Sequence, residues 1–362
     1  MKVIIFAGGF GRRLWPISLS SSPKQFEPII GDRSTIQLAV DRVLPQFGAE
    51  NIFISTNQRY ADIIRDQLPD VPAENVIGEP TRRDLAAAVG LAMAHLAKTG
   101  SANEPVGILW GDNYMKDVAV FQSVMGSAEK IIQNKEADMV FMGESARFAN
   151  ANLGWIDLGK QRGTAEGNAF YDFGKLTYRP EQSLCEEMYA SGNCVWNTGY
   201  FVTSLGYVQN AYKKYMPEMA AQLDEIAASI GTADYQATLD RIYPTLESIS
   251  FDDAILTHLD PAGAAVLHAP MGWSDPGTLY SLKEAINPSM DENVTRGRVI
   301  DSDSKDSLVY NYEDHKIVMG VGLDGMIVVN TPSAVLVVHK DDIKKVKALV
   351  EGFAGTDLEK FS

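Results

Sequence analysis

The chain has 362 residues, with 32 lysines and arginines against 47 aspartates and glutamates, and so a formal net charge of -15 at pH 7. A field of this sign repels nucleic acids and anionic membranes, and it makes any local basic cluster informative about small anionic ligands. With 45% hydrophobic and 22% charged residues, the composition indicates a folded protein of two or three domains and excludes a wholly disordered chain.

The cysteine content and the lengths of the apolar runs indicate the cellular compartment in which the protein works. Cys185 and Cys194 are too few for a disulfide framework, and the five histidines lack the spacing of a zinc site. The first apolar run ends at Gly8, too early for a signal-peptide core, and no run approaches the roughly 20 residues that span a bilayer. We therefore expect a cytoplasmic protein without a membrane or nucleic-acid partner.

The first half of the chain alternates short apolar runs with amphipathic segments, which predict buried strands and helices respectively. The strands are expected at 3–7, 51–55, 106–110 and 138–142, and the helices at 35–46, 60–68, 84–98 and 118–134. Ser34 and Gln37 fit a capping box at the start of the first helix. Such alternation indicates an α/β fold with a Rossmann-like, mostly parallel sheet that is covered on both faces. Because ligands bind beyond the carboxyl ends of such strands, the loops at Gly8 and Gly111 should face one site.

The second half is less regular. Residues 150–180 are rich in glycine, asparagine and aromatic residues, which favours short antiparallel strands or a lid. Two long helices and a strand are expected next, at about 206–229, 233–242 and 265–268.

Beyond about residue 288, short apolar runs recur at roughly ten-residue intervals with Asp, Gly and Asn at the turns, which predicts a second, β-rich domain. Segment 341–352 has acidic residues first and lysines later, as a helix would. We expect a larger domain over 1–287 and a small β-helix-like domain over 288–362 that ends in this helix.

A glycine-rich loop follows the first predicted strand. Gly8, Gly9 and Gly11 let the backbone approach a ligand and direct N–H groups at phosphate oxygens, and the arginine pair at 12–13 adds positive charge. The loop fits neither the P-loop pattern nor the dinucleotide pattern GxGxxG, in which Leu14 would stand where a small residue is needed. The pattern favours a polyphosphate ligand over a turn that merely connects two elements.

The longer string GGFGRRLWPIS, followed by SPKQF at 22–26, resembles the N-terminal motif of sugar-phosphate nucleotidyltransferases, and most of all their mannose-1-phosphate guanylyltransferase group. In that family the loop wraps a nucleoside triphosphate. The resemblance implies that Arg13 and Lys24 are the catalytic cations, that Arg13 and the three loop glycines bind the nucleotide, and that 1–287 is the catalytic domain of a nucleotide-diphospho-sugar transferase fold.

Two further motifs resemble the family's nucleotide and metal elements. EPTRRD at 79–84 is similar to EPxxRN and implies nucleotide contacts from Glu79, Pro80 and Arg83; Asp84 replaces the usual asparagine, and we favour a helix cap for it. The resemblance of GDN at 111–113 and GWSDPG at 272–277 to the family's acidic turns implies two magnesium ligands. These are Asp112, which also serves the nucleotide site, and Asp275.

The sugar side of the family pattern is matched with one departure. LGWI at 153–156 resembles YGYI, and WNTG at 196–199 resembles WNSG, while the family's EKP appears as YRP at 178–180. The implied sugar-phosphate residues are Gly154, Tyr178, Arg179 and Asn197. Because a phenol accepts fewer hydrogen bonds than a carboxylate, Tyr178 leaves the identity of the sugar open. We expect core packing for at least one of Trp196 and Trp273.

Two carboxylates, several cations and a glycine loop together suit nucleotidyl transfer. Magnesium prefers oxygen ligands and retains waters, so two aspartates are enough to hold it. We expect in-line attack of mannose 1-phosphate on the α-phosphorus of GTP, which gives GDP-mannose and pyrophosphate, with Mg2+ assisting.

Two alternatives remain open: a nucleotidyltransferase for another sugar 1-phosphate or another nucleoside triphosphate, and a non-catalytic nucleotide-sugar-binding regulatory protein. The second would not need all four of Arg13, Lys24, Asp112 and Asp275. The resemblance also implies a homodimer through the C-terminal domain. Because the chain ends without the cupin strands of longer relatives, we expect no isomerase activity.

Overall fold

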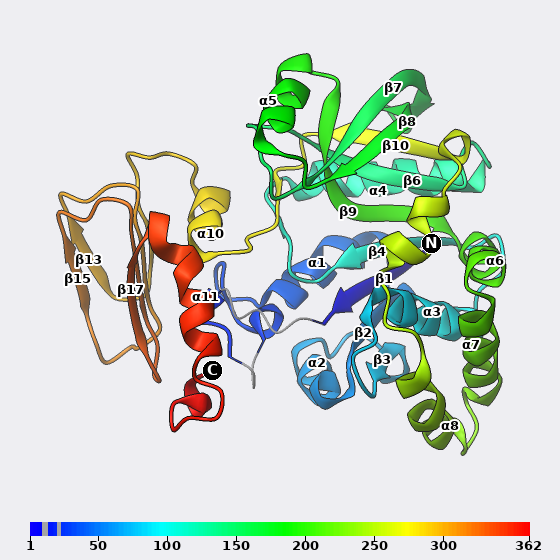
Figure 1. Cartoon of the computed structure of the whole chain (residues 1–362), viewed down its shortest axis with the longest axis horizontal. Helices are drawn as coiled ribbons and strands as arrows, with labels where there is room; N and C mark the ends of the chain where they lie inside the picture. Colours follow the sequence, from blue (N-terminus) through cyan, green and yellow to red (C-terminus); the bar gives the residue numbers. More distant parts are fainter. Residues whose placement is uncertain (9–13, 20–22) are drawn as a thin grey trace. The chain divides into compact units, whose positions relative to one another are not determined.

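The computed structural model describes residues 1–8, 14–19 and 23–362 (Figure 1). They form two compact units. The first contains residues 1–8, 39–110 and 115–273; the second contains the described residues of 14–38 together with 111–114 and 274–362. The predicted boundary at 287 therefore lies within the second unit.

A nine-stranded sheet of order β3-β2-β1-β4-β9-β6-β10-β8-β7 forms the centre of the first unit. Its strands are β1 (Lys2–Ala7), β2 (Ile52–Asn57), β3 (Val76–Glu79), β4 (Pro105–Trp110), β6 (Met139–Ser145), β7 (Gly154–Ala165), β8 (Asn168–Tyr178), β9 (Cys194–Ser204) and β10 (Ala264–Ala269). Only β8 and β9 run against the direction of the others, so the sheet is mostly parallel, as predicted. β1 and β4 are parallel neighbours, and Gly8 and Gly111 follow them at the same edge.

Helices follow the strands in the first half of the chain, as the periodicity predicts. They are α1 (Thr35–Phe47), α2 (Ala61–Gln67), α3 (Asp84–Leu96) and α4 (Val118–Gln133), and later in the chain α5 (Gln182–Ser191), α6 (Leu205–Tyr215), α7 (Pro217–Ser229), α8 (Tyr235–Ile242) and α9 (Phe251–Ala254). The capping box at the start of α1 is confirmed: the Gln37 amide donates to Ser34 Oγ at 3.4 Å, and the Ser34 amide donates to Gln37 Oε1 at 3.0 Å.

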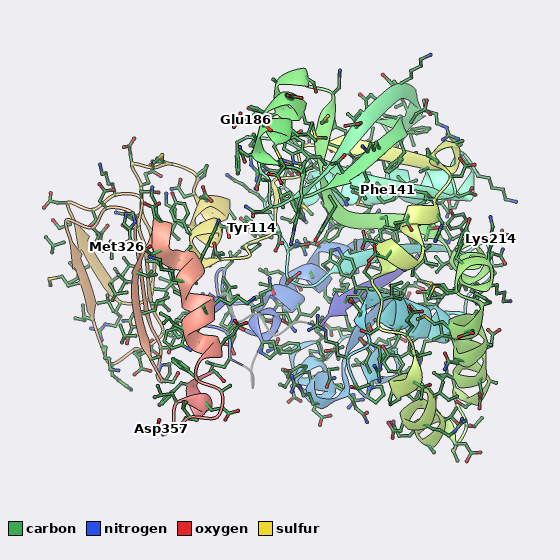
Figure 2. The ribbon with its side chains drawn as sticks, in the orientation of Figure 1. Tyr114, Phe141, Glu186, Lys214, Met326 and Asp357 are labelled. Carbon is green, nitrogen blue, oxygen red and sulfur yellow. The ribbon has the colours of Figure 1, made fainter. Side chains whose placement is uncertain are left out.

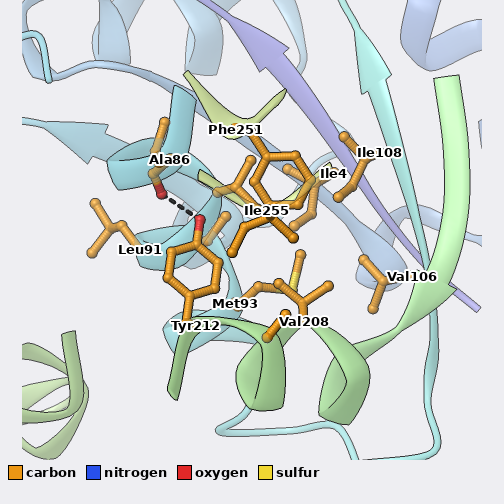
Figure 3. Close-up of a cluster of buried hydrophobic side chains, with 14 of the residues drawn as sticks. Ile4, Ala86, Leu91, Met93, Val106, Ile108, Val208, Tyr212, Phe251 and Ile255 are labelled. Carbon is orange, nitrogen blue, oxygen red and sulfur yellow. Dashed lines mark hydrogen bonds between the residues drawn. The ribbon is translucent and has the colours of Figure 1, made fainter. Parts of the chain in front are cut away.

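A hydrophobic core lies between one face of this sheet and helices α3, α6 and α7. Ile4, Val106 and Ile108 point from β1 and β4 toward side chains of α3 and α6 (Figure 3). The Tyr212 hydroxyl donates to the carbonyl of Ala86 at 2.5 Å, which joins α6 to α3. α4 packs against β4, β6 and β9, and every residue of β1 is buried, so both faces of the sheet are covered.

Two expectations for the middle of the chain are wrong. Segment 206–229 forms two helices rather than one, because Pro217 has no N–H to donate inside a continuous helix and instead begins α7. Residues 154–178 do form antiparallel strands, as expected, but these are the two long strands of one hairpin, β7–β8, rather than short ones. Phe141 of β6 packs near this hairpin, with its ring centroid 5.0 Å from that of Phe173 (Figure 2).

In the second unit, short strands wind into a β-helix-like coil, which is called the C-terminal coil below, and two helices accompany it. It contains β12 (Val294–Arg296), β13 (Val299–Ser302), β14 (Leu308–Asn311), β15 (Val318–Val321), β16 (Met326–Asn330), β17 (Val335–His339), α10 (Leu279–Ile286) and α11 (Ile343–Glu351). β13 pairs parallel with β15, and β14 with β16, in both cases with residues 19 positions further along the chain. The side-chain amide of Asn330 donates to Asn311 Oδ1 at 2.8 Å, and these two residues are also 19 positions apart. The C-terminal domain is therefore β-rich and coiled, as predicted.

Two very short strands, β5 (Tyr114–Met115) and β11 (Trp273–Ser274), pair with each other. Within the described parts of the chain, no helix has both the length and the apolar composition needed to cross a membrane.

Candidate functional site

Lys24 lies at the centre of a charged cluster in the second unit. It begins the short 3-10 helix Lys24–Phe26, and only 7% of it is exposed. Its Nζ lies 2.7 Å from Asp112 Oδ2 and 4.0 Å from Asp275 Oδ1. Asp112 stands in the turn after β4, and Asp275 directly follows β11. The fold thus brings together three residues that the sequence singles out in three distant motifs.

Two carboxylates that converge on one positive charge are candidate ligands for a metal cation. Aspartate oxygens are hard donors of the kind that magnesium prefers, and magnesium commonly takes one or two carboxylates and completes its shell with water and phosphate oxygens. No third His, Cys, Asp or Glu joins these two as a ligand group among the described residues. The donor set therefore suits magnesium, together with a phosphate ligand, better than it suits zinc.

Part of the predicted nucleotide site cannot be placed. Gly9, Gly11 and Arg13 lie outside the described residues. Gly8 is described and exposed, directly after β1.

Glu79, the last residue of β3, has two hydroxyl partners. The Tyr243 hydroxyl donates to one carboxylate oxygen at 2.7 Å, and Ser55 Oγ donates to the other at 3.3 Å. Burial raises the pKa of Glu79 to about 7, although both hydrogen bonds act to lower it. The predicted nucleotide contact is therefore a carboxyl group that changes its charge near neutral pH.

The rest of the EPTRRD element is held against a neighbouring segment. The Arg83 guanidinium donates to the carbonyl of Pro244, and Pro80 is half-buried. The expected cap at Asp84 needs a correction. Arg83 occupies the N-cap position of α3, and Asp84 is the first helical residue, at φ 62°, where its carboxylate accepts the amide of Leu85 at 2.8 Å.

Three of the four predicted sugar-side residues lie side by side in the sheet. Gly154 of β7 is paired with Tyr178 of β8 on one side and with Asn197 of β9 on the other. A Cβ at Gly154 would lie 3.4 Å from the Cβ of Asn197, so a small residue keeps this spot open. Tyr178 is 68% exposed, and the guanidinium of Arg179, the fourth residue, lies 5.0 Å from its ring centroid. Tyr178 and Arg179, which stand in place of the Glu and Lys of EKP, therefore both face solvent, and Tyr178 borders Gly154.

Trp196 and Trp273 are both buried, which confirms core packing for them. The ring of Trp196 packs edge-on against Trp155 and Phe148, with centroids 6.3 and 5.1 Å apart, and the Arg147 guanidinium lies 4.8 Å from its centroid.

Sequence reasoning missed Glu144, near the end of β6. This carboxylate accepts the amide N–H groups of Met271, Gly272 and Trp273. Burial raises its pKa more than these bonds and Arg147 lower it. The one available signal was a glutamate within the apolar run MVFMGES.

Two family models match the chain in succession. The model described as nucleotidyl transferase matches residues 2–292, and the model described as a MannoseP isomerase/GMP-like beta-helix domain matches residues 297–353.

Similar proteins cover nearly the whole chain. A putative mannose-1-phosphate guanylyltransferase of Vibrio cholerae is 30% identical over 355 residues, which are 96% of this chain and 73% of the relative. A mannose-1-phosphate guanylyltransferase of Escherichia coli K12 is 27% identical, over 96% of this chain and 72% of its own. A crystal structure from Thermus thermophilus, titled mannose-1-phosphate geranyltransferase, has the same fold, with a TM-score of 0.85 at 24% identity over 97% of this chain and 98% of its own.

Proposed function

We propose that this chain, which belongs to the nucleotidyl transferase family, transfers GMP from GTP to mannose 1-phosphate and releases GDP-mannose and pyrophosphate. The observation that carries the proposal is the cluster of Lys24, Asp112 and Asp275, which joins a buried ammonium and two carboxylates. The two substrates are inferred from the names of relatives that are similar over 96% of this chain.

The chain's own residues would act by positioning and by neutralising charge. The sugar phosphate is already an anionic nucleophile, so the attack on the α-phosphorus needs no protein nucleophile, and pyrophosphate leaves on the opposite side. Lys24, held beside Asp112, would offer its ammonium to phosphate oxygens. We assign the same task to Arg13, and nucleotide contacts to Gly8, Gly9, Gly11, Glu79, Pro80 and Arg83.

The metal assignment follows from the donor set. Asp112 and Asp275 would hold Mg2+, since both carboxylates already converge on one positive charge. When bound, magnesium would neutralise phosphate oxygens and favour the approach of two anionic substrates.

On the sugar side, we propose that Asn197 binds hydroxyl groups and that Arg179 meets the phosphate. An amide offers both donors and an acceptor to a diol. Asn197 Oδ1 accepts the amide of Gly199 at 3.0 Å, which holds the side chain in place. Gly154 leaves room beside it, and exposed Tyr178 borders the same row of the sheet.

Tyr178 also favours a second candidate, which is the same reaction with another sugar 1-phosphate. Where the family pattern has a carboxylate that accepts several hydrogen bonds, this chain presents one phenol. A panel of sugar phosphates and nucleoside triphosphates separates the two candidates. Faster turnover with a pair other than mannose 1-phosphate and GTP would contradict the first.

The first experiment is pyrophosphate release from GTP and mannose 1-phosphate with Mg2+, followed through a coupled pyrophosphatase. We expect steady release, and a loss of about a hundredfold or more in Asp112→Asn, which removes one metal-binding charge. The matched control is Asp324→Asn, which alters an exposed aspartate paired with Lys305 at 3.3 Å in the same unit. Full activity of Asp112→Asn would refute the metal assignment, and silence of the wild type across the panel would indicate a regulatory binding protein instead.

We further propose a homodimer through the C-terminal domain. Ile300 of β13 lies opposite Met319 of β15, and Val321 follows on the same face two residues later; all three are exposed. An apolar sheet face of this kind is typical of a surface that a second copy covers. We also propose a cytoplasmic location, which is supported by two cysteines, Cys185 and Cys194, that are not joined in a disulfide, and by the proposed use of GTP.

A further inference from the structure

A buried glutamate holds the backbone segment that directly precedes Asp275. Glu144 is only 2% exposed, and its carboxylate accepts the amides of Met271, Gly272 and Trp273 at 3.0, 3.3 and 3.1 Å. Hydrogen bonds to an ionised acceptor are about twice as strong as neutral ones. Three consecutive amides on one carboxylate therefore fix both the place and the orientation of this segment.

The carbonyl groups of segment 271–273 are held as well. Those of Met271 and Gly272 accept the amides of Asp117 and Lys116, at 2.9 and 3.2 Å. The guanidinium of Arg147 donates to the third carbonyl at 3.2 Å and lies 3.4 Å from Glu144 Oε1. Every backbone N–H and C=O of the segment thus has a partner within the first unit.

These contacts link the two stretches of chain that carry the candidate metal ligands. Trp273 lies two residues before Asp275, and Lys116 lies four residues after Asp112. Gly272 has a left-handed φ of 65°, and a Cβ there would come within 2.7 Å of the Cβ of Lys116. The stretches therefore approach as closely as glycine allows.

We infer that Glu144 is a positioning residue for the cation site. Through segment 271–273, Glu144 joins the backbone just before Asp275 to the backbone just after Asp112. It thereby limits how far the two carboxylates can move relative to each other. A fixed arrangement favours magnesium, which tolerates little departure from octahedral geometry. Arg147 assists by holding both Glu144 and the last carbonyl of the segment. The inference rests on the metal assignment proposed above.

Glu144→Gln tests this role. The variant keeps the shape of the side chain, but its amide nitrogen cannot accept a hydrogen bond, so at least one of the three amides loses its partner. We expect the dissociation constant for Mn2+, measured by the free-ion EPR signal with GTP present, to rise about tenfold, in line with groups that orient metal ligands elsewhere. The Mg2+ concentration for half-maximal activity should rise in parallel, while KM for GTP at saturating Mg2+ stays within about twofold.

Hydrogen exchange provides a readout that needs no turnover. The peptide that contains residues 271–273 should exchange faster in Glu144→Gln than in the wild type, and peptides of the C-terminal coil should not. Asp306→Asn is the matched control, because it also removes a buried carboxylate, but one whose partners Tyr280, Lys283 and Lys340 all belong to the second unit. It should lower stability without changing Mn2+ affinity.

Unchanged Mn2+ affinity in Glu144→Gln, or an equal loss in Asp306→Asn, would overturn the inference. Its failure is distinguishable from failure of the proposed function, because the wild type and Asp112→Asn report on the latter. If the wild type binds no Mn2+ or Asp112→Asn binds it normally, the metal assignment itself is wrong.

Discussion

At the scale of single residues, the charge of Glu79 depends on its burial. Its folded pKa of about 7 lies above the ordinary value of 4.5, because burial disfavours the ionised form. A carboxyl with a raised pKa contributes its stability below the unfolded value and loses it as the pH rises through the folded value. The stability penalty from Glu79 therefore builds up as the pH rises from about 4.5 to about 7, and it is complete above pH 7.

Glu79→Gln should remove this penalty. At about 1.4 kcal/mol per pKa unit, the variant should gain roughly 3 kcal/mol in free energy of unfolding relative to the wild type as the pH rises from 4.5 to above 7. Urea unfolding of both proteins across this range measures the difference. Glu74→Gln, at an exposed position, serves as control: its difference from the wild type in free energy of unfolding should not change with pH. A flat difference for Glu79→Gln as well would contradict the raised pKa.

Asp306 shows the opposite case, a buried carboxylate that is fully paired. It accepts Lys283 Nζ at 2.8 Å, Lys340 Nζ at 2.5 Å and the Tyr280 hydroxyl at 2.9 Å. Burial acts to raise its pKa, but these hydrogen bonds outweigh burial and lower it.

Asp306→Asn should therefore cost about 3–5 kcal/mol in free energy of unfolding, because it leaves two lysines without their counter-charge. Asp324→Asn, at an exposed ion pair, should cost less than about 1 kcal/mol. Denaturant titration at pH 7 compares them. Because the folded pKa of Asp306 is lowered, the cost of Asp306→Asn should shrink as the pH falls below the ordinary carboxyl pKa. Equal costs for the two variants would contradict this account.

Some residues of the candidate site could be predicted from the sequence, and others could not. Lys24, Asp112 and Asp275 stand in motifs that a family resemblance identifies, and the structure brings them together. Glu144 stands in no such motif. Its partners lie 127 to 129 residues further along the chain, so only the fold shows that they meet.

At the scale of elements, the sequence predicted those helices and strands whose conformation depends mainly on residues close to them in the chain. The capping box placed the start of α1, and apolar periodicity found β1, β2, β4 and β6. β9 was missed because polar residues at 197–199 interrupt its apolar pattern, and its pairing with β4 and β6 decides its conformation. α5 was also missed, because only Cys185 and Met188 of its ten residues are buried, which leaves a short apolar stripe.

The turns of the coil offer a test of element geometry. Gly297 and Gly322 both have left-handed φ angles, of 73° and 65°. A Cβ at Gly297 would lie 2.1 Å from the backbone oxygen of Asn311, whereas one at Gly322 would meet nothing within 4 Å. Gly322→Ala should cost about 1–2 kcal/mol through its φ alone, and Gly297→Ala should cost distinctly more. Thermal unfolding of both variants would contradict this if their midpoints agreed.

At the scale of the whole molecule, the sequence predicted an α/β part and a β-rich part but not how the chain alternates between units. Residues 111–114 belong with the C-terminal unit although β4 directly precedes them. Contacts between distant segments determine this grouping, and no composition shift marks it. The same grouping places Asp112 with Lys24 and Asp275.

Substitutions in the exposed apolar face of β13 and β15 test the proposed dimer. Met319→Glu should yield monomers in sedimentation equilibrium at micromolar concentration, because a charge within an apolar interface is costly to bury. Val337→Glu, on β17 of the other sheet and exposed to a similar 62% against 65%, should leave the dimer intact. A wild type that sediments as a monomer, or a dimer broken only by Val337→Glu, would refute this assignment.

The 19-residue step of the coil makes the C-terminal domain a modular stack. Each rung needs only its neighbours above and below, as in repeat proteins whose stability is a sum of local terms. Duplicating one complete rung, residues 308–326, should therefore lengthen the stack by about 4.8 Å without disturbing the rungs on either side. A duplication of any other length would shift every later side chain out of phase with the coil.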